Sequence, residues 1–257
     1  MEDETGTSGI QVRPVAGFPE VKPGDDVISQ VAEGLETLAP SIVAGDVVVV
    51  AQKIVSKAQD RFARLSEVEV SPEADELASK CDKDPRIVQL VLQESRGVVR
   101  TGPGILIAQH VSGHIMANAG IDRSNVRGDE DTVLLLPLDP DGWCASAQRL
   151  LSNRLGVHLG VVMADSFGRP WRVGTAGVAI GTAGMTARKD VRGMPDRFGR
   201  LLESTEIGVA DEVAAAASLV MGQTNEGVPV VVVSGLDCAG DGRAADLLRS
   251  SERDLFR

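Results

Sequence analysis

Residues 46–51 read DVVVVA, a short β-branched run that is apolar after its first residue. Residues 159–164 (LGVVMA) and 228–234 (VPVVVVS) have the same character. Continuous apolar runs of this length are typical of strands that are buried on both faces, and a sheet made of such strands needs helices to cover it. These three stretches therefore predict the centre of a helix-covered sheet.

Capping residues predict helices between these strands. Ser71-Pro72 and Asp84-Pro85 each place a capping oxygen directly before a proline at the first helical position. Residues 211–221 are rich in alanine and predict a third helix, which ends at Gly222. Because helices and buried strands alternate along the chain, we expect an α/β fold. Residues 167–202 are rich in Gly, Arg and Asp with little periodicity, which predicts a long irregular segment that is functional or disordered.

Composition narrows the class of protein. Of the 257 residues 43% are hydrophobic, which is ample for a packed core. A net charge of −11 and an aromatic content of 3% argue against a nucleic-acid partner. The sequence has neither an apolar run of the ~20 residues that a membrane span needs nor the features of a signal peptide, so we expect a soluble, cytoplasmic protein without membrane contacts. Residues 1–10 are small and polar, which predicts disorder, and we expect order from residue 11 onward.

Two early segments carry charged residues beside predicted elements. Residues 17–26 (GFPEVKPGDD) favour a plain turn that leads into a helix capped by Asp25 or Asp26. Residues 52–57 (QKIVSK) directly follow the first predicted strand. Two lysines at the end of a buried strand suit a phosphate, because ligands of open α/β sheets gather at the carboxyl ends of strands. A pair of solvated lysines explains this second segment equally well.

The segment after the second predicted strand is the most informative. Asp165 and Ser166 come directly after it, and a carboxylate beside a hydroxyl is a pair that holds Mg²⁺ while phosphates supply the remaining ligands. Arg169 and Arg172 then offer guanidinium groups to phosphate or carboxylate oxygens. We favour this functional interpretation over a structural Asp-Arg pair.

Two further polar segments have a functional and a structural interpretation. Asp122, Ser124 and Asn125 place a carboxylate, a hydroxyl and an amide within four residues, which suits a hard cation or a ribose but also an Asx-turn. Residues 221–228 (MGQTNEGV) can reach a metal or a guanine edge, or they form a polar helix-to-strand loop. No P-loop pattern and no G-x-G-x-x-G pattern occurs, so a nucleotide would be held in another way.

Taken together, these segments resemble the F420-0:γ-glutamyl ligase family. The resemblance extends over about residues 11–257 and rests on five ordered motifs: 17–20 (GFPE), 55–57 (VSK), 117–126 (ANAGIDRSNV), 165–172 (DSFGRPWR) and 221–231 (MGQTNEGVPVV). It implies one ligase domain, a two-lobed α/β unit that forms an intertwined homodimer. It also implies GTP-dependent addition of L-glutamate to the free carboxylate of coenzyme F420-0, and then of further γ-linked glutamates, through an acyl phosphate.

The resemblance also implies cofactors and site residues. It implies a divalent metal, Mg²⁺ or Mn²⁺, and leaves a role for K⁺ open. The resemblance implies that Asp122 and Asp165 are ligands of one metal and that Ser166 and Gln223 are ligands of a second. The implied charge-stabilising catalytic residues are Lys57, Arg169 and Arg172. The implied GTP contacts are Phe18, Pro19, Glu20, Val21, Gln52, Lys57, Asn125, Met221, Gly222, Gln223, Thr224, Asn225, Glu226, Gly227 and Val228. Two rival functions stay open: a carboxylate-amine ligase with a different acceptor, and a non-catalytic nucleotide-binding regulator.

Overall fold

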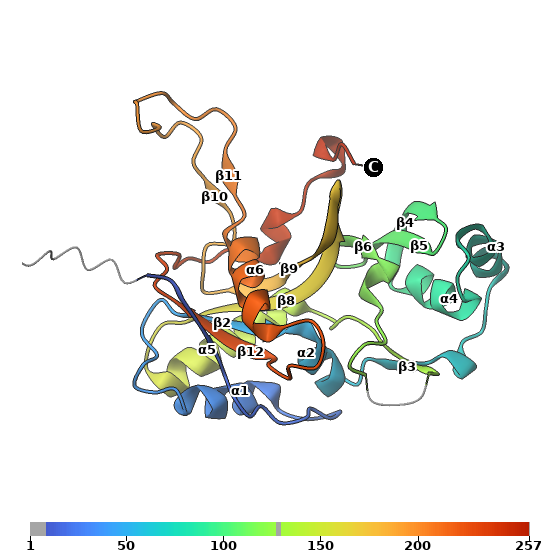
Figure 1. Cartoon of the computed structure of the whole chain (residues 1–257), viewed down its shortest axis with the longest axis horizontal. Coiled ribbons are helices and arrows are strands. Elements are labelled where there is room, and N and C mark those ends of the chain that lie inside the picture. Colours follow the sequence, from blue (N-terminus) through green and yellow to red (C-terminus); the bar gives the residue numbers. More distant parts are fainter. Residues whose placement is uncertain (1–8, 127–129, 257) are drawn as a thin grey trace, which may run out of the picture.

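A computed structural model describes residues 9–126 and 130–256 of the chain and contains a central five-stranded sheet (Figure 1). In spatial order its strands are β1 (Gln11–Pro14), β12 (Val230–Ser234), β2 (Val47–Ala51), β8 (Gly160–Arg169) and β9 (Arg172–Ala183). Within this sheet β2 and β8 run parallel, and the other neighbours are antiparallel. All three strands predicted from apolar runs are therefore confirmed, and they lie side by side at the centre.

Helices cover both faces of the sheet (Figure 1). The helices α1 (Val27–Glu36) and α5 (Pro140–Leu155) pack against one face, and α6 (Val209–Met221) packs against the other. Asp26 caps α1 through its side chain, as the turn at residues 17–26 predicts, and α6 ends at Gly222 as expected. The strands β12 and β2 and the inner half of β8 are buried because both faces of the sheet have this cover.

Close packing between α6 and the sheet depends on a glycine in β9. A Cβ atom built on Gly177 would lie 2.3 Å from the carbonyl oxygen of Ala214 in α6. Atoms at that separation overlap, so a larger residue would push the helix away from the strand. Gly177 lies opposite Ser166 of β8, so this contact also fixes the helix over one of the predicted metal ligands.

A second group of elements, residues 62–134, has a core of its own, separate from the sheet (Figure 1). The helix α2 (Gln52–Ala58) leads from β2 toward this group. Its elements are β3 (Phe62–Arg64), η1 (Leu65–Glu67), α3 (Pro72–Cys81), α4 (Pro85–Gln93), β4 (Ser95–Gly102), β5 (Ile105–His110), β6 (Ile115–Ala117), η2 (Asn118–Gly120) and β7 (Thr132–Leu134). Ser71 and Asp84 cap α3 and α4, which confirms both predicted helix starts.

The expectation of irregular structure over residues 167–202 is wrong for its first half. The strand β8 continues past Ala164 to Arg169, and β9 pairs with it to form a long hairpin. The strand changes from buried to exposed along its length, so its outer half lacks the apolar run that reveals its inner half. Asp165 and Ser166 therefore lie within a strand and not after its end.

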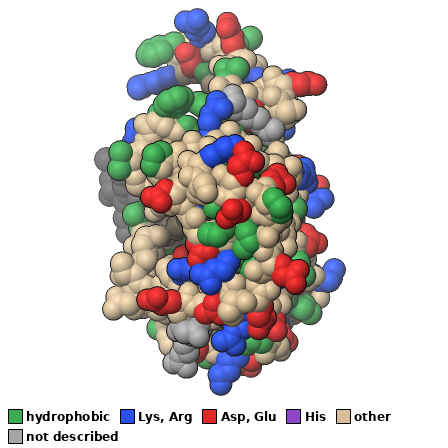
Figure 2. Space-filling view, turned by 90° about the vertical axis from the view of Figure 1, so that its right-hand side faces the viewer, with side chains coloured by type: hydrophobic (Ala, Val, Ile, Leu, Met, Phe, Trp, Pro, Cys, Tyr) green, Lys and Arg blue, Asp and Glu red, His purple; other side chains and the backbone are tan. Residues whose placement is uncertain are grey.

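Beyond the hairpin the chain forms a projecting arm, residues 189–207 (Figure 1). The short strands β10 (Lys189–Asp190) and β11 (Glu206–Ile207) pair at its base. Met194, Phe198 and Leu201 are exposed on the arm. In Figure 2 the arm forms the top of the molecule, and acidic and basic side chains are interspersed over the face below it. The 3-10 turns η3 (Ala244–Leu247) and η4 (Ser251–Arg253) follow the last strand.

Two expectations concern the termini and membranes. The predicted disorder of residues 1–10 falls mostly on residues 1–8, which lie outside the described residues, and residues 9–10 have no regular structure before β1 begins at Gln11. None of the helices in the described part of the chain has the length and apolar character required to cross a membrane.

Candidate functional site

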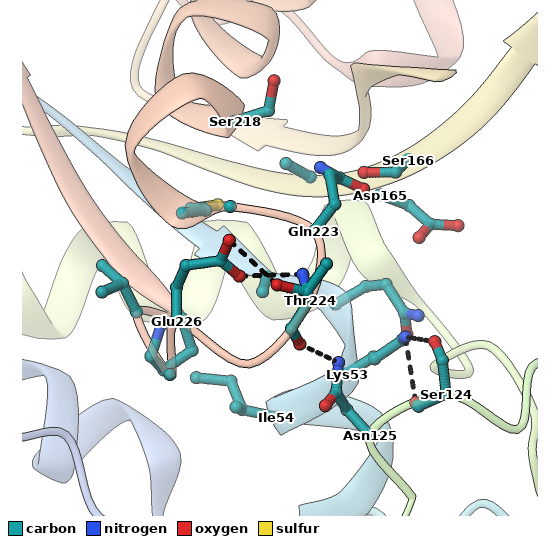
Figure 3. A pocket seen from close by; sticks show the side chains of 18 of the residues that line it. Lys53, Ile54, Ser124, Asn125, Asp165, Ser166, Ser218, Gln223, Thr224 and Glu226 are labelled. Atoms are coloured by element: carbon teal, nitrogen blue, oxygen red, sulfur yellow. Dashed lines mark hydrogen bonds between the residues drawn. The ribbon is translucent and has the colours of Figure 1, made fainter. Parts of the chain in front are cut away.

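A cleft of about 480 Å³ opens where β2 ends and its parallel pairing with β8 stops (Figure 3). Ala51 and Ala164 are register partners at the last paired position of these strands. The next residue along each chain is Gln52 and Asp165, so the sheet itself sets these two polar side chains beside each other. The volume of the cleft is within the range of pockets that hold small ligands and cofactors.

The cleft brings together nearly all the predicted site residues. Those that line it are Phe18, Pro19, Glu20, Val21, Gln52, Lys57, Asp122, Asn125, Asp165, Ser166, Met221, Gly222, Gln223, Thr224, Asn225, Glu226, Gly227 and Val228. They come from five separate segments of the chain. Arg169 and Arg172 are not among the described residues that line this cleft, because they lie at the exposed tip of the β8–β9 hairpin.

Asp165 is a carboxylate with little compensation for its charge. Burial raises its pKa to about 6, and the negative charge of Asp122 acts in the same direction. The backbone N–H of Ser166, the positive charge of Lys53 and the side-chain amide of Gln52 oppose this shift only in part. The Gln52 amide is oriented by Ser56, whose hydroxyl donates to Gln52 Oε1 at 2.8 Å. A buried carboxylate in this state attracts a cation.

Asp122 is the second carboxylate that lines the cleft, and nearby donors compensate its negative charge. Its Oδ1 accepts from the backbone N–H groups of Arg123 at 2.6 Å and Ser124 at 2.8 Å, and its Oδ2 forms a 2.7 Å ion pair with Lys53 Nζ. Burial alone would raise the pKa of Asp122, but the hydrogen bonds from Lys53 and Ser124 lower it. The Asx-turn that the sequence allows at residues 122–124 is thus present.

A second lysine of α2 also reaches the cleft. Lys57 is largely buried, and its Nζ donates to Glu20 Oε1 at 2.9 Å. This pair ties the early segment 18–21 to the helix that follows β2. Lys57 therefore presents a positive charge at the cleft wall, held in place by an acidic partner that an anionic ligand can replace.

The loop 221–228 closes one side of the cleft, and its shape depends on Glu226. The Glu226 carboxylate accepts from the backbone N–H of Thr224 at 2.8 Å and from its hydroxyl at 3.1 Å. Gly222 has a φ of +72°, which residues with a Cβ rarely adopt, and a Cβ there would also lie 2.1 Å from Glu226 Cδ. Across the cleft, Asn125 Nδ2 donates to Thr224 O at 2.8 Å, which links the two predicted nucleotide-contacting loops (Figure 3).

The donor set fits a hard divalent cation. Asp122 and Asp165 supply carboxylates, Ser166 a hydroxyl, and Gln223 an amide whose side chain extends toward Ser166 in Figure 3. Among the described residues no three His, Cys, Asp or Glu side chains gather as a metal site, so the two carboxylates would need further oxygen ligands. Mg²⁺ is commonly held by one or two carboxylates together with substrate phosphates.

The structure adds residues to the cleft that the motifs alone do not assign. Lys53, Thr175, Gly177 and Ser218 all line it, as does Ser124, which the sequence offers as an oxygen ligand without assigning it to the metal or to GTP. Lys53 lies within the predicted lysine segment, but its partners at residues 122–124 are about 70 positions away in sequence. Thr175 and Gly177 belong to β9, the strand that apolar patterning does not reveal.

Comparison with known proteins gives a consistent picture. The family model for "F420-0:Gamma-glutamyl ligase" matches residues 17–235. The chain is 42% identical to the coenzyme F420:L-glutamate ligase of Methanothermobacter thermautotrophicus, over 97% of this chain and 99% of that protein. It is 40% identical to the protein of the same name from Methanopyrus kandleri (98% and 99% covered). It is 41% identical to that of Archaeoglobus fulgidus (96% of both).

Proposed function

Because the chain belongs to the F420-0:γ-glutamyl ligase family, we propose that it joins L-glutamate to the free carboxylate of coenzyme F420-0, and then adds further γ-linked glutamates, using GTP and a divalent metal. A carboxylate is a poor electrophile and must be activated first. In the proposed reaction the carboxylate oxygen attacks the γ-phosphorus of GTP, GDP leaves, and an acyl phosphate forms. The glutamate amine then attacks the acyl carbon, the amide bond forms, and phosphate leaves with the carboxylate oxygen.

One observation carries this proposal: two carboxylates, a buried lysine and the 221–228 loop meet in a single cleft where the pairing of β2 with β8 stops. Phosphoryl transfer asks a protein mainly for positioning and charge neutralisation, and these groups provide both. Asp122 and Asp165 would hold one divalent metal, and Ser166 and Gln223 would hold a second. When bound, the metal neutralises charge on the nucleotide phosphates.

The residues of the cleft that the resemblance assigns to GTP would bind the nucleotide. Lys57 can exchange its Glu20 partner for a phosphate oxygen without leaving the cleft wall. Gly222 and Gly227, both with positive φ, let the backbone of the loop 221–228 come close to a ligand. Asn125 and Thr224 would enclose the nucleotide from opposite sides through the hydrogen bond that joins them. We propose guanine as the base on the resemblance, and we leave a role for K⁺ open.

A homodimer completes the proposal, and exposed apolar side chains support it. Trp171 at the tip of the hairpin is 87% exposed, and Phe198 on the arm is 90% exposed. Large apolar side chains at two projections suit a contact with a second copy. Arg169 and Arg172 flank Trp171 at that tip, so their predicted catalytic role requires the tip to reach the cleft of a partner subunit.

An assay with mass detection tests the ligase proposal. The protein is incubated with coenzyme F420-0, L-glutamate, GTP and Mg²⁺ or Mn²⁺, and the product is examined for added glutamyl residues. We expect glutamate addition that requires both GTP and the metal, and its loss in Asp165→Asn. Lys80→Met, on the exposed surface of α3, is the matched control and should retain activity. Failure of the wild-type protein to add glutamate would overturn the proposal, and equal activity without metal would overturn its metal component.

A further inference from the structure

Lys53 is the one charged residue of the cleft that the proposed mechanism does not use, and the described residues surround it with oxygen atoms. Its Nζ donates to Asp122 Oδ2 at 2.7 Å, to Ser124 Oγ at 2.6 Å and to Ser124 O at 3.1 Å (Figure 3). An ammonium group has three N–H donors, so all three are used. Lys53 thus sits in the turn 122–124 as a bound cation would.

The carboxylate of Asp122 has no vacant acceptor position in this arrangement. Its Oδ1 accepts two backbone N–H groups, and its Oδ2 accepts the Ser124 hydroxyl at 2.7 Å and the Lys53 ammonium. Two carboxylate oxygens offer about four lone pairs in all, and four donors occupy them. A metal ion can bond to Asp122 only if one donor leaves.

Lys53 is the donor that can leave. The backbone N–H groups are fixed by the turn, whereas Lys53 carries its charge on a flexible four-carbon stem. It also repels a dication, since like charges at this range oppose each other. The positive charge of Lys53 also lowers the pKa of Asp165, the second carboxylate, so one ammonium group acts on both proposed metal ligands.

We propose that Lys53 is an internal counter-cation that balances Asp122 and Asp165 in the metal-free protein and is displaced when a divalent metal binds. This inference rests on the metal site of the proposed function and adds to it a residue that sets metal affinity. Lys53 weakens binding of the metal and keeps the turn 122–124 in order when the metal is absent.

Titration with Mn²⁺ alone tests the proposal, because no turnover is needed. Free Mn²⁺ is followed by electron paramagnetic resonance in the wild-type protein, Lys53→Met and Lys80→Met. Lys80 is the matched control, since its Nζ also donates to a carboxylate, Glu76, at 2.7 Å, but on α3 away from the cleft. We expect Lys53→Met to bind Mn²⁺ about tenfold more tightly, the effect of one hydrogen bond to a charged group, and Lys80→Met to bind as the wild type does.

A second measurement uses the wild-type protein and holds even if Lys53→Met fails to fold. Reductive methylation followed by peptide mass spectrometry reports how accessible each lysine amine is. Mg²⁺ should increase labelling of Lys53 and leave labelling of Lys80 unchanged. Equal or weaker Mn²⁺ binding by a folded Lys53→Met, or Lys53 labelling that Mg²⁺ does not change, would overturn the inference while leaving the ligase proposal intact. If none of the proteins binds Mn²⁺, the metal component of the proposed function fails together with it.

Discussion

Replacing Asp165 by asparagine should make the metal-free protein more stable while abolishing its activity. The pKa of Asp165 is raised from its ordinary value of 3.8 to about 6, chiefly by burial. The unfolded chain therefore releases this proton more readily than the folded one, so ionisation of Asp165 opposes folding. A shift of about two pKa units corresponds to about 3 kcal/mol at most. Asparagine keeps the shape of the side chain and removes the charge, so the free energy of unfolding should rise by between about 1 and 3 kcal/mol.

The pH dependence of this gain follows from the same two pKa values. Below pH 3.8 Asp165 is protonated in the folded and the unfolded state, so it does not lower the free energy of unfolding. Above pH 6 it is ionised in both states, and the loss of free energy of unfolding is complete. The gain from Asp165→Asn should thus be largest at about pH 7.5 and nearly vanish at about pH 4. At about pH 7.5 a gain of this size corresponds to a rise in Tm of roughly 2 to 6 °C.

The assay is thermal unfolding in EDTA at both pH values, with Asp122→Asn for comparison. The pKa of Asp122 is lowered, so its charge favours folding, and its removal should destabilise the protein at neutral pH. Opposite signs for two carboxylates in one cleft are hard to produce by a general effect of substitution. An Asp165→Asn variant that is less stable than wild type, or equally stabilised at both pH values, would refute the reasoning.

Three further outcomes follow from the site and the packing. In Mg²⁺, GTP at about 100 times its Kd should stabilise the protein by about 2.7 kcal/mol in thermal unfolding, and equal protection by ATP would contradict the proposed preference for guanine. Light scattering at low micromolar concentration should give about 54 kDa, twice the 27.0 kDa of the chain, and a fully active monomer would contradict the homodimer. Gly177→Ala should lower the free energy of unfolding by about 1 to 3 kcal/mol through its clash with Ala214, whereas Gly168→Ala, whose Cβ meets no atom within 4 Å, should change it little.

The parts of the fold that the sequence predicts are those with local signals. The strands β2, β12 and the inner half of β8 are uninterrupted apolar runs, and Ser71 and Asp84 mark their helices by capping oxygens before proline. The outer half of β8 and the facing part of β9 carry no such signal, because exposed strand residues need no apolar side chains to pair through their backbones. The small sheet β4–β5–β6 is missed for a similar reason, since β4 is mostly exposed.

The sequence likewise predicts only part of the candidate site. Ordered motifs predict which segments form the cleft, and the structure gathers them there. They do not predict the hydrogen bond between Asn125 and Thr224, or the ion pair of Lys53 with Asp122, because each joins residues about 70 to 100 positions apart. Nor do they predict that Arg169 and Arg172 lie at the tip of a hairpin, since that depends on how far β8 continues beyond its buried half.

The position of β12 in the central sheet has a consequence for synthesis of the protein. β12 comes last of the five strands in the chain, yet it lies between β1 and β2, which are made first. During synthesis, β1 and β2 therefore cannot pair with β12, the strand between them, until residues 230–234 have been made. The group at residues 62–134, whose core forms from contacts within that range apart from Leu135, can fold well before then. In a nascent chain stalled before residue 230, that group should therefore resist protease, whereas β1, whose neighbour in the sheet is β12, should remain accessible to a chaperone.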